Sequence, residues 1–141
     1  MNINRLSESL ECFDKVLELN PTFSNAYNLK GDILRQMLKH QEALQCYNTA
    51  IELNSTDSIA YSNKAYTLSE LKQYEEAIIN YDKALELNPS NPMTLNNKGY
   101  ALKEINKLQE AVECFDKAIQ LDPNFQIADI NKQIVSKLIY N

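Results

Sequence analysis

Apolar residues recur at intervals of three and four along the chain, which is the spacing that one face of an α-helix requires. The spacing predicts helices over 58–71 and 75–88, with a break near Lys72. The second of these helices carries Ala77, Ile78, Tyr81, Ala84 and Leu85. After it, Asn91 can cap a further helix and Pro92 can take that helix's first position, where a missing N–H costs nothing. The pattern predicts helices in pairs.

The same residue types return at a fixed period. Pro89 and Pro123 are 34 residues apart, and the segment DKALELNP at 82–89 returns as DKAIQLDP at 116–123. Three further columns keep this period: Ala43, Ala77 and Ala111; Phe13, Tyr47, Tyr81 and Phe115; and Gly31, Ala65 and Gly99. We expect the small column to face the alanines where two helices cross, with the aromatic column beside the crossing. Each period is therefore one helix pair, and the chain is a stack of such pairs.

These columns resemble the tetratricopeptide repeat (TPR) family. The resemblance implies an all-α fold, an α-solenoid wound as a right-handed superhelix, with three full repeats and a half repeat at each end. In a single domain, 1–141, it places the second helix of a partial repeat at 6–23, full repeats at 24–57, 58–91 and 92–125, and a closing helix at 126–141. Tyr27 and Tyr61 stand in the first aromatic column of the family pattern, from which Leu95 departs in the third repeat. Lys30, Lys64 and Lys98 stand where the family usually has leucine.

Composition and charge narrow the possible partners. The chain has 141 residues, 44% of them hydrophobic, and only two glycines, which favours helices over a sheet protein that needs many special turns. Its formal net charge is −5 and its pI is about 4.9, so we expect no nucleic acid and no anionic membrane surface as partner. Without a leader or a long apolar run, the sequence predicts a cytoplasmic protein.

The sequence offers little for catalysis. His40 is the only histidine, and we interpret it as a half-buried packing residue at a bend between helices. Cys12, Cys46 and Cys114 share one column, and stacked repeats hold such residues too far apart for a disulfide. There is no glycine-rich phosphate loop, and carboxylates such as Glu75 lie on a predicted solvated face. We expect no catalytic residues, no metal, no cofactor and no enzyme activity of its own.

The TPR resemblance places the binding surface on the first helix of each repeat, facing the hollow of the superhelix. The residues that we assign to peptide binding are Asn28, Asp32, Asn63, Tyr66, Asn97, Tyr100 and Asn131. Asn63, Asn97 and Asn131 form an amide ladder, one per repeat, whose spacing suits the backbone of an extended peptide. A similar ladder lines the repeat superhelix of O-linked N-acetylglucosamine transferases. The alternative is that these asparagines merely follow the asparagine-rich composition.

A column of lysines accompanies the ladder and consists of Lys30, Lys64, Lys98 and Lys132. Either their stems pack between helices while the ammonium groups reach water, or they form a basic rail for an acidic ligand. The family's chaperone-tail binders instead use a basic clamp at five places, which here hold Asn28, Asp32, Asn63, Met93 and Asn97. Only Asn63 matches, so we expect no binding of a chaperone C-terminal tail.

The function that these observations favour is a non-catalytic scaffold or adaptor that binds a peptide segment of a protein partner in its concave groove. The alternatives are a substrate-recruiting segment of a larger enzyme and a self-assembling structural module.

The two end helices suggest a homo-oligomer. The residues that we assign to self-association are Phe13, Leu17, Ile127, Ile130, Ile134 and Leu138. We expect Ala128, Val135 and Ile139 to pack on the third repeat, which leaves the closing helix apolar on two sides. The closing helix of one copy would then dock near the opening helix of another, as a ring, a filament or a reciprocal dimer. The alternative is that the chain was cut from a longer array.

Overall fold

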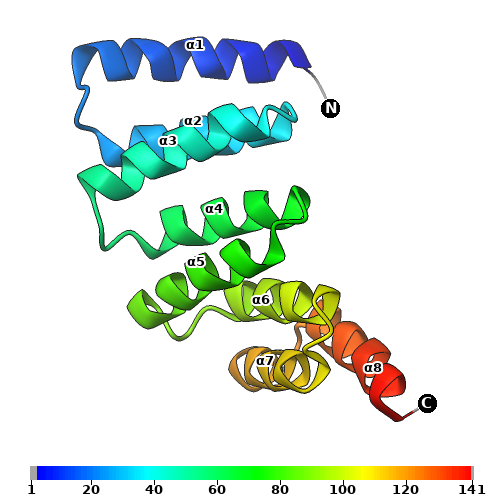
Figure 1. Ribbon diagram of the computed structural model, residues 1–141. Coiled ribbons are helices and arrows are strands. Elements are labelled where there is room, and N and C mark those ends of the chain that lie inside the picture. The colour runs from blue at the N-terminus through cyan, green and yellow to red at the C-terminus, as the bar shows by residue number, and fades with distance from the viewer. Residues whose placement is uncertain (1–2, 141) are drawn as a thin grey trace.

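The computed structural model describes the backbone of residues 3–140, and within that range it consists of eight α-helices without a strand. The helices are α1 (Ile3–Leu19), α2 (Ser24–Gln36), α3 (His40–Leu53), α4 (Ser58–Glu70), α5 (Tyr74–Leu87), α6 (Pro92–Glu104), α7 (Leu108–Leu121) and α8 (Gln126–Tyr140). They stack in chain order from α1 at one end to α8 at the other (Figure 1). The predicted all-α solenoid is confirmed, and α4 and α5 end within one residue of their predicted limits.

Side-chain caps begin two of the first helices. Asn91 accepts a hydrogen bond from the backbone N–H of Thr94 at 3.1 Å, and Pro92 follows as the first helical residue, as the sequence predicted. Asp57 caps α4 in the same way through the N–H groups of Ile59 and Ala60. These caps fix where a new repeat starts.

The bend inside each repeat is built without glycine. Leu38, Lys72 and Asn106 each adopt φ of 61°, the left-handed region that glycine usually fills after a helix. Around Leu38, its own N–H donates to the backbone oxygen of Arg35 and the N–H of Lys39 donates to that of Leu34. The same two bonds recur at the other two bends, so three equivalent Schellman turns reverse the chain.

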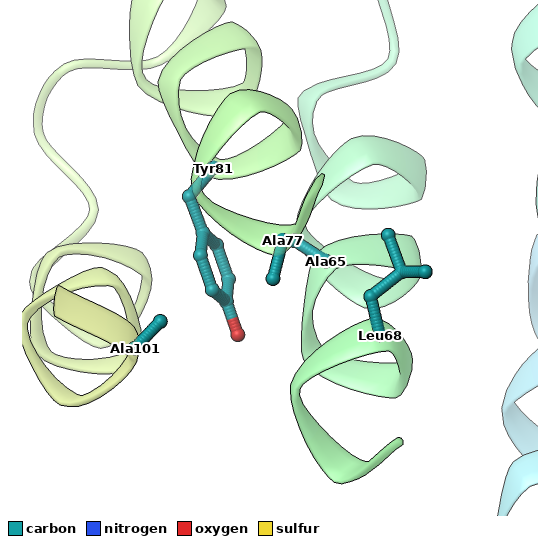
Figure 2. Packing of buried hydrophobic residues seen from close by; sticks show 5 residues of the cluster. All are labelled: Ala65, Leu68, Ala77, Tyr81 and Ala101. Atoms are coloured by element: carbon teal, nitrogen blue, oxygen red, sulfur yellow. The ribbon is translucent and has the colours of Figure 1, made fainter. Parts of the chain in front are cut away.

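The two glycines make room for aromatic rings where a helix pair crosses. A Cβ atom on Gly31 would lie 2.7 Å from Cε1 of Tyr47, and one on Gly99 would lie 2.6 Å from Cε1 of Phe115. The nearest neighbour of each glycine is therefore the aromatic column, whereas the sequence analysis expected the alanine column there. In the second repeat, Tyr81 reaches from α5 between Ala101 of α6 and the α4 pair Ala65 and Leu68, all of them buried (Figure 2).

The stack curves because its two sides are packed differently. Each first helix contacts the next first helix, in the pairs α2 with α4, α4 with α6, and α6 with α8. Within the described residues, no such contact joins one second helix to the next. The first helices therefore line the tighter, concave side, and α3, α5 and α7 form the convex side.

The closing helix α8 packs on the third repeat as expected. Ala128 and Val135 are fully buried, and Ile139 packs against the cluster around Phe115. In the three full repeats, positions 4, 8 and 11 of the first helix share one helical face, and positions 8 and 11 pack against that repeat's own second helix. They hold Tyr27, Gly31 and Leu34; Tyr61, Ala65 and Leu68; and Leu95, Gly99 and Leu102. In α8 these positions are Asp129, Gln133 and Ser136, so the face that would receive another second helix is polar.

Candidate functional site

A pocket of about 430 Å³ opens on the concave side, where the second and third repeats meet. The residues that line it are Tyr66, Ser69, Glu70, Lys72, Tyr74, Tyr81, Asn96, Asn97, Tyr100 and Asn131. Four of the seven predicted binding residues, Tyr66, Asn97, Tyr100 and Asn131, are among them. The rings of Tyr66 and Tyr100 are 39% and 42% exposed, so they present aromatic surface to the groove.

The other three predicted binding residues lie outside this pocket. Asn28 is only 3% exposed, and its side-chain oxygen accepts a hydrogen bond from the Asn63 amide at 3.1 Å. Asp32 accepts hydrogen bonds from Arg35 at 2.8 Å and from Gln36 at 3.1 Å. The structure therefore separates the predicted set into a pocket group between repeats 2 and 3 and a polar group between repeats 1 and 2.

Two rungs of the amide ladder hold neighbouring repeats together. The Asn63 amide donates to Asn28, and the Asn131 amide donates to the Asn96 oxygen at 2.9 Å. Asn96 in turn donates to the oxygen of Asn97 at 3.3 Å. The ladder therefore has a structural use that the sequence analysis did not foresee, and the groups that it leaves to a ligand are the Asn97 amide and the Asn131 oxygen.

Tyr81 contributes a buried polar group to the pocket. Its side chain is inaccessible to solvent, yet its hydroxyl has no hydrogen-bond partner among the described residues. Ser69 comes near this hydroxyl, but the Ser69 hydroxyl donates to the backbone oxygen of Ala65 at 3.1 Å. Burial raises the pKa of Tyr81 above its usual range, so the phenol stays neutral and can donate or accept a hydrogen bond.

The corresponding place between repeats 1 and 2 is occupied by a side chain of the protein itself. Arg35 lies with its guanidinium carbon 5.0 Å from the centre of the Tyr66 ring and with one nitrogen 3.6 Å from Glu70. Beneath it, burial raises the pKa of Tyr47 to about 12. His40 is half-buried, as predicted, and its Nδ1 lies 3.7 Å from the other Glu70 oxygen.

The lysine column is bound to aspartates and forms no free rail. Lys30 pairs with Asp14, Lys98 with Asp82 and Lys132 with Asp116, each at 2.5 to 2.6 Å, so each bond joins a first helix to the preceding second helix. For Lys30 and Lys132 the hydrogen bond is the main cause of a raised pKa. For Lys98 burial is the largest single effect and lowers the pKa, but the hydrogen bond to Asp82 and the attraction of nearby acidic groups together raise it. Lys64 is the exception, because Asn48 stands in the aspartate column.

The residues assigned to self-association divide by exposure. Leu17 is 9% exposed and Phe13 is half-buried, so the opening helix presents little of either to another chain. The exposed apolar stripe of α8 consists of Ile127, Ile130, Ile134 and Leu138, which are 48 to 58% exposed. By the repeat register this stripe continues the concave face of Tyr66 and Tyr100. Association of two copies stays a prediction.

The structure also places the three cysteines outside the pocket between repeats 2 and 3. Cys12, Cys46 and Cys114 are free thiols, as expected from their spacing. In the described part of the chain, no three histidine, cysteine or acidic side chains are grouped so as to hold a metal ion. No helix there is both long and apolar enough to cross a bilayer.

Sequence reasoning missed Tyr81 as part of the pocket, and it placed Ser69 and Glu70 on the groove face by their register without assigning them to binding. Tyr81 was interpreted only as core, because its column fills the space beside the helix crossing. The available signal was position 12 of the first helix, which is Arg35 in repeat 1, Ser69 in repeat 2 and Lys103 in repeat 3. Ser69 is the one short side chain at this position, and it lies at the junction between repeats 2 and 3, where the pocket is open.

Comparison with known proteins agrees with this architecture. No functionally curated protein matches the chain in sequence. Among solved structures, the first TPR of Spaghetti (RPAP3) bound to the HSP90 peptide SRMEEVD is 23% identical with a TM-score of 0.82, over 84% of this chain and 94% of that one. The Arabidopsis OM64 TPR domain is 25% identical with a TM-score of 0.78, over 81% of this chain and 94% of that one. MamA is 18% identical with a TM-score of 0.85, over 91% of this chain and 75% of that one.

The family model of the tetratricopeptide repeat matches residues 24–57, 58–91 and 92–125, which is most of the chain. The helix pairs and the bends recur at these same intervals, and the crossing of a small residue with an aromatic ring recurs with Gly31, Ala65 and Gly99. The chain therefore belongs to the tetratricopeptide repeat family.

Proposed function

We propose that this protein is a non-catalytic interaction module that holds a peptide segment of a partner protein on its concave face. The observation that carries the proposal is the pocket between repeats 2 and 3, which gathers two half-exposed tyrosines and three asparagines from α4, α6 and α8. TPR domains are typically modules of protein interaction rather than catalysts. A rigid helical stack with exposed aromatic rings also loses little entropy on binding.

The pocket also indicates how the segment is held. The Asn97 amide can donate to a peptide oxygen and the Asn131 oxygen can accept from a peptide N–H, because their structural bonds leave these groups available. The stripe of α8 extends the same face with aliphatic surface. A segment lying along α6 and α8 would therefore find backbone partners beside the third repeat and apolar contacts beyond it.

Acidic chaperone tails are not the ligand that we propose. RPAP3 binds the HSP90 peptide SRMEEVD, but the five places that would form the clamp here contain no lysine or arginine. Without charge-assisted bonds, burying a terminal carboxylate costs more than it returns. We expect fluorescence polarisation with labelled SRMEEVD to show no saturable binding, and saturation that is lost on adding unlabelled peptide would contradict this expectation.

A peptide library displayed on phage tests the proposed function. We expect the wild-type protein to enrich a family of sequences and the double variant Asn97→Ala, Tyr100→Ala to lose them. Ile79→Ala is the matched control, since Ile79 is an exposed apolar residue on the second helix α5. Enrichment that survives the double variant, or that is lost equally in the control, would reject the concave site. Asn63 is left intact because its amide holds two repeats together.

A further inference from the structure

The place between repeats 1 and 2 shows which kind of group this fold accommodates between two first helices. There Arg35 packs over the ring of Tyr66 at 5.0 Å, within the roughly 6 Å of a cation–π contact. One guanidinium nitrogen donates to Asp32 at 2.8 Å, and another lies 3.6 Å from Glu70. A planar cation thus bridges the two repeats.

The next junction keeps the aromatic part of this frame without the arginine, since Tyr66 stands at the position equivalent to Asp32. Glu104, at the position equivalent to Glu70, pairs with Lys103 at 2.7 Å. Ser69 is the residue of repeat 2 that corresponds to Arg35, and Tyr100 corresponds to Tyr66. The serine is too short to reach Tyr100, and its hydroxyl turns back to the backbone of α4. Lys103 lies 4.4 Å from the centre of the Tyr100 ring but does not line the pocket. The space that a guanidinium fills in one junction is open in the other.

The open place is lined by hydrogen-bond acceptors that have unused capacity. Glu70 has contacts of 3.6 and 3.7 Å with Arg35 and His40, both longer than the roughly 3.2 Å limit of a good hydrogen bond. The buried hydroxyl of Tyr81 has no partner among the described residues, and the side-chain oxygen of Asn131 accepts no bond there. Lys72 stands on the exposed rim.

We infer that this pocket takes an arginine side chain of the partner segment, with the guanidinium between the rings of Tyr66 and Tyr100 and donating to Glu70. The inference rests on the proposed function and specifies its ligand. A guanidinium offers five N–H donors in a plane, which suits two aromatic walls and several acceptors. A lysine ammonium is a compact charge that neither stacks nor donates in a plane, and citrulline has the shape of arginine without its charge.

Four capped tripeptides, Ac-Gly-X-Gly-NH2 with X as arginine, citrulline, lysine or tyrosine, test this inference in NMR titrations of the 15N-labelled protein. We expect the arginine peptide to shift the amides of α4 and α6 around the pocket, with an affinity about tenfold above that of the citrulline peptide. Equal affinity for arginine and citrulline, or a higher affinity for lysine or tyrosine, would overturn the inference.

Two substitutions give each junction the side chain that the other junction has at position 12 of the first helix. Ser69→Arg supplies the guanidinium from the protein itself and should abolish binding of the arginine peptide, while Ser90→Arg adds the same charge on an exposed loop and should leave binding unchanged. Arg35→Ser opens the first junction and should create a second site, with shifts around Asp32 on α2, which lies outside the first pocket. If folded Ser69→Arg still binds the arginine peptide, the assignment is wrong.

The two proposals can fail separately. Library segments that depend on the concave face but not on an arginine would leave the proposed function standing and remove this inference. Arginine peptides that bind the pocket while no library segment is enriched would do the opposite.

Discussion

At the scale of single residues, the lysine–aspartate ion pairs that join successive repeats follow a rule with one exception. Three lysines of the first helices pair with aspartates located 16 residues before them, at positions 14, 82 and 116. The fourth, Lys64, has Asn48 at that position. The link between repeats 1 and 2 therefore lacks the lysine–aspartate pair that the other links have.

Asn48→Asp should supply that ion pair. We expect it to raise the free energy of unfolding by about 0.5 kcal/mol, since exposed pairs contribute between about 0 and 1 kcal/mol. Urea denaturation at low and high salt measures the effect, which should shrink as salt screens the pair. The gain should vanish in the background Lys64→Gln, and an equal gain there would show that the pair is not its cause.

The pocket could be predicted from the sequence only in part. Tyr66, Tyr100 and the asparagines followed from the repeat register, because in a periodic fold the position of a residue within its repeat decides whether it faces the concave or the convex side. Tyr81 did not, because its role depends on how its ring meets the short side chain of Ser69 in the same repeat, although the register did place Ser69 on the groove face. Such three-dimensional complementarity has no fixed spacing along the chain. The hydrogen bonds of Asn63 and Asn131 were missed for the same reason.

At the scale of helices, the bends carry backbone strain that the sequence pattern did not reveal. The periodicity predicted the helices, and the capping residues predicted the starts of α4 and α6 well. A glycine would have marked the left-handed residue of each bend, but Leu38, Lys72 and Asn106 occupy these sites. A left-handed conformation costs a residue with a Cβ about 1 kcal/mol, and asparagine pays least of the three.

Leu38→Gly should relieve this strain. Leu38 is 77% exposed, so the substitution removes little packing, and we expect it to raise the free energy of unfolding by about 0.5 to 1 kcal/mol. Thermal or urea unfolding measures it. Asn106→Gly is the matched control and should give a smaller gain, because asparagine tolerates the left-handed region. A loss of stability in Leu38→Gly would show that its side chain stabilises the bend.

At the scale of the whole molecule, stability should be highest in the middle of the stack. Within the described residues, each repeat contacts its neighbours, and the backbone of α1 comes close to α2 alone. We expect hydrogen exchange to protect residues 44–112 most and to be fastest in α1 and α8. Mass spectrometry of exchanged peptides gives the profile. Slower exchange in α1 or α8 than in α5 would contradict nearest-neighbour stability, and concentration-dependent protection of α8 would support association of two copies.

The polar face of α8 has a consequence for how such an array can grow by duplication. A second helix added after α8 would meet Asp129 and Gln133. The equivalent positions of the other repeats hold an aromatic residue or leucine and a small residue, so the added helix would have no apolar surface to pack on. A copy of residues 92–125 inserted ahead of Gln126 would instead meet compatible surfaces on both sides, because Ala128 and Val135 would pack on the copied helices as they do on the original. The array can therefore lengthen its binding surface by insertion ahead of α8, and each such insertion would preserve the packing of α8 on the repeat before it.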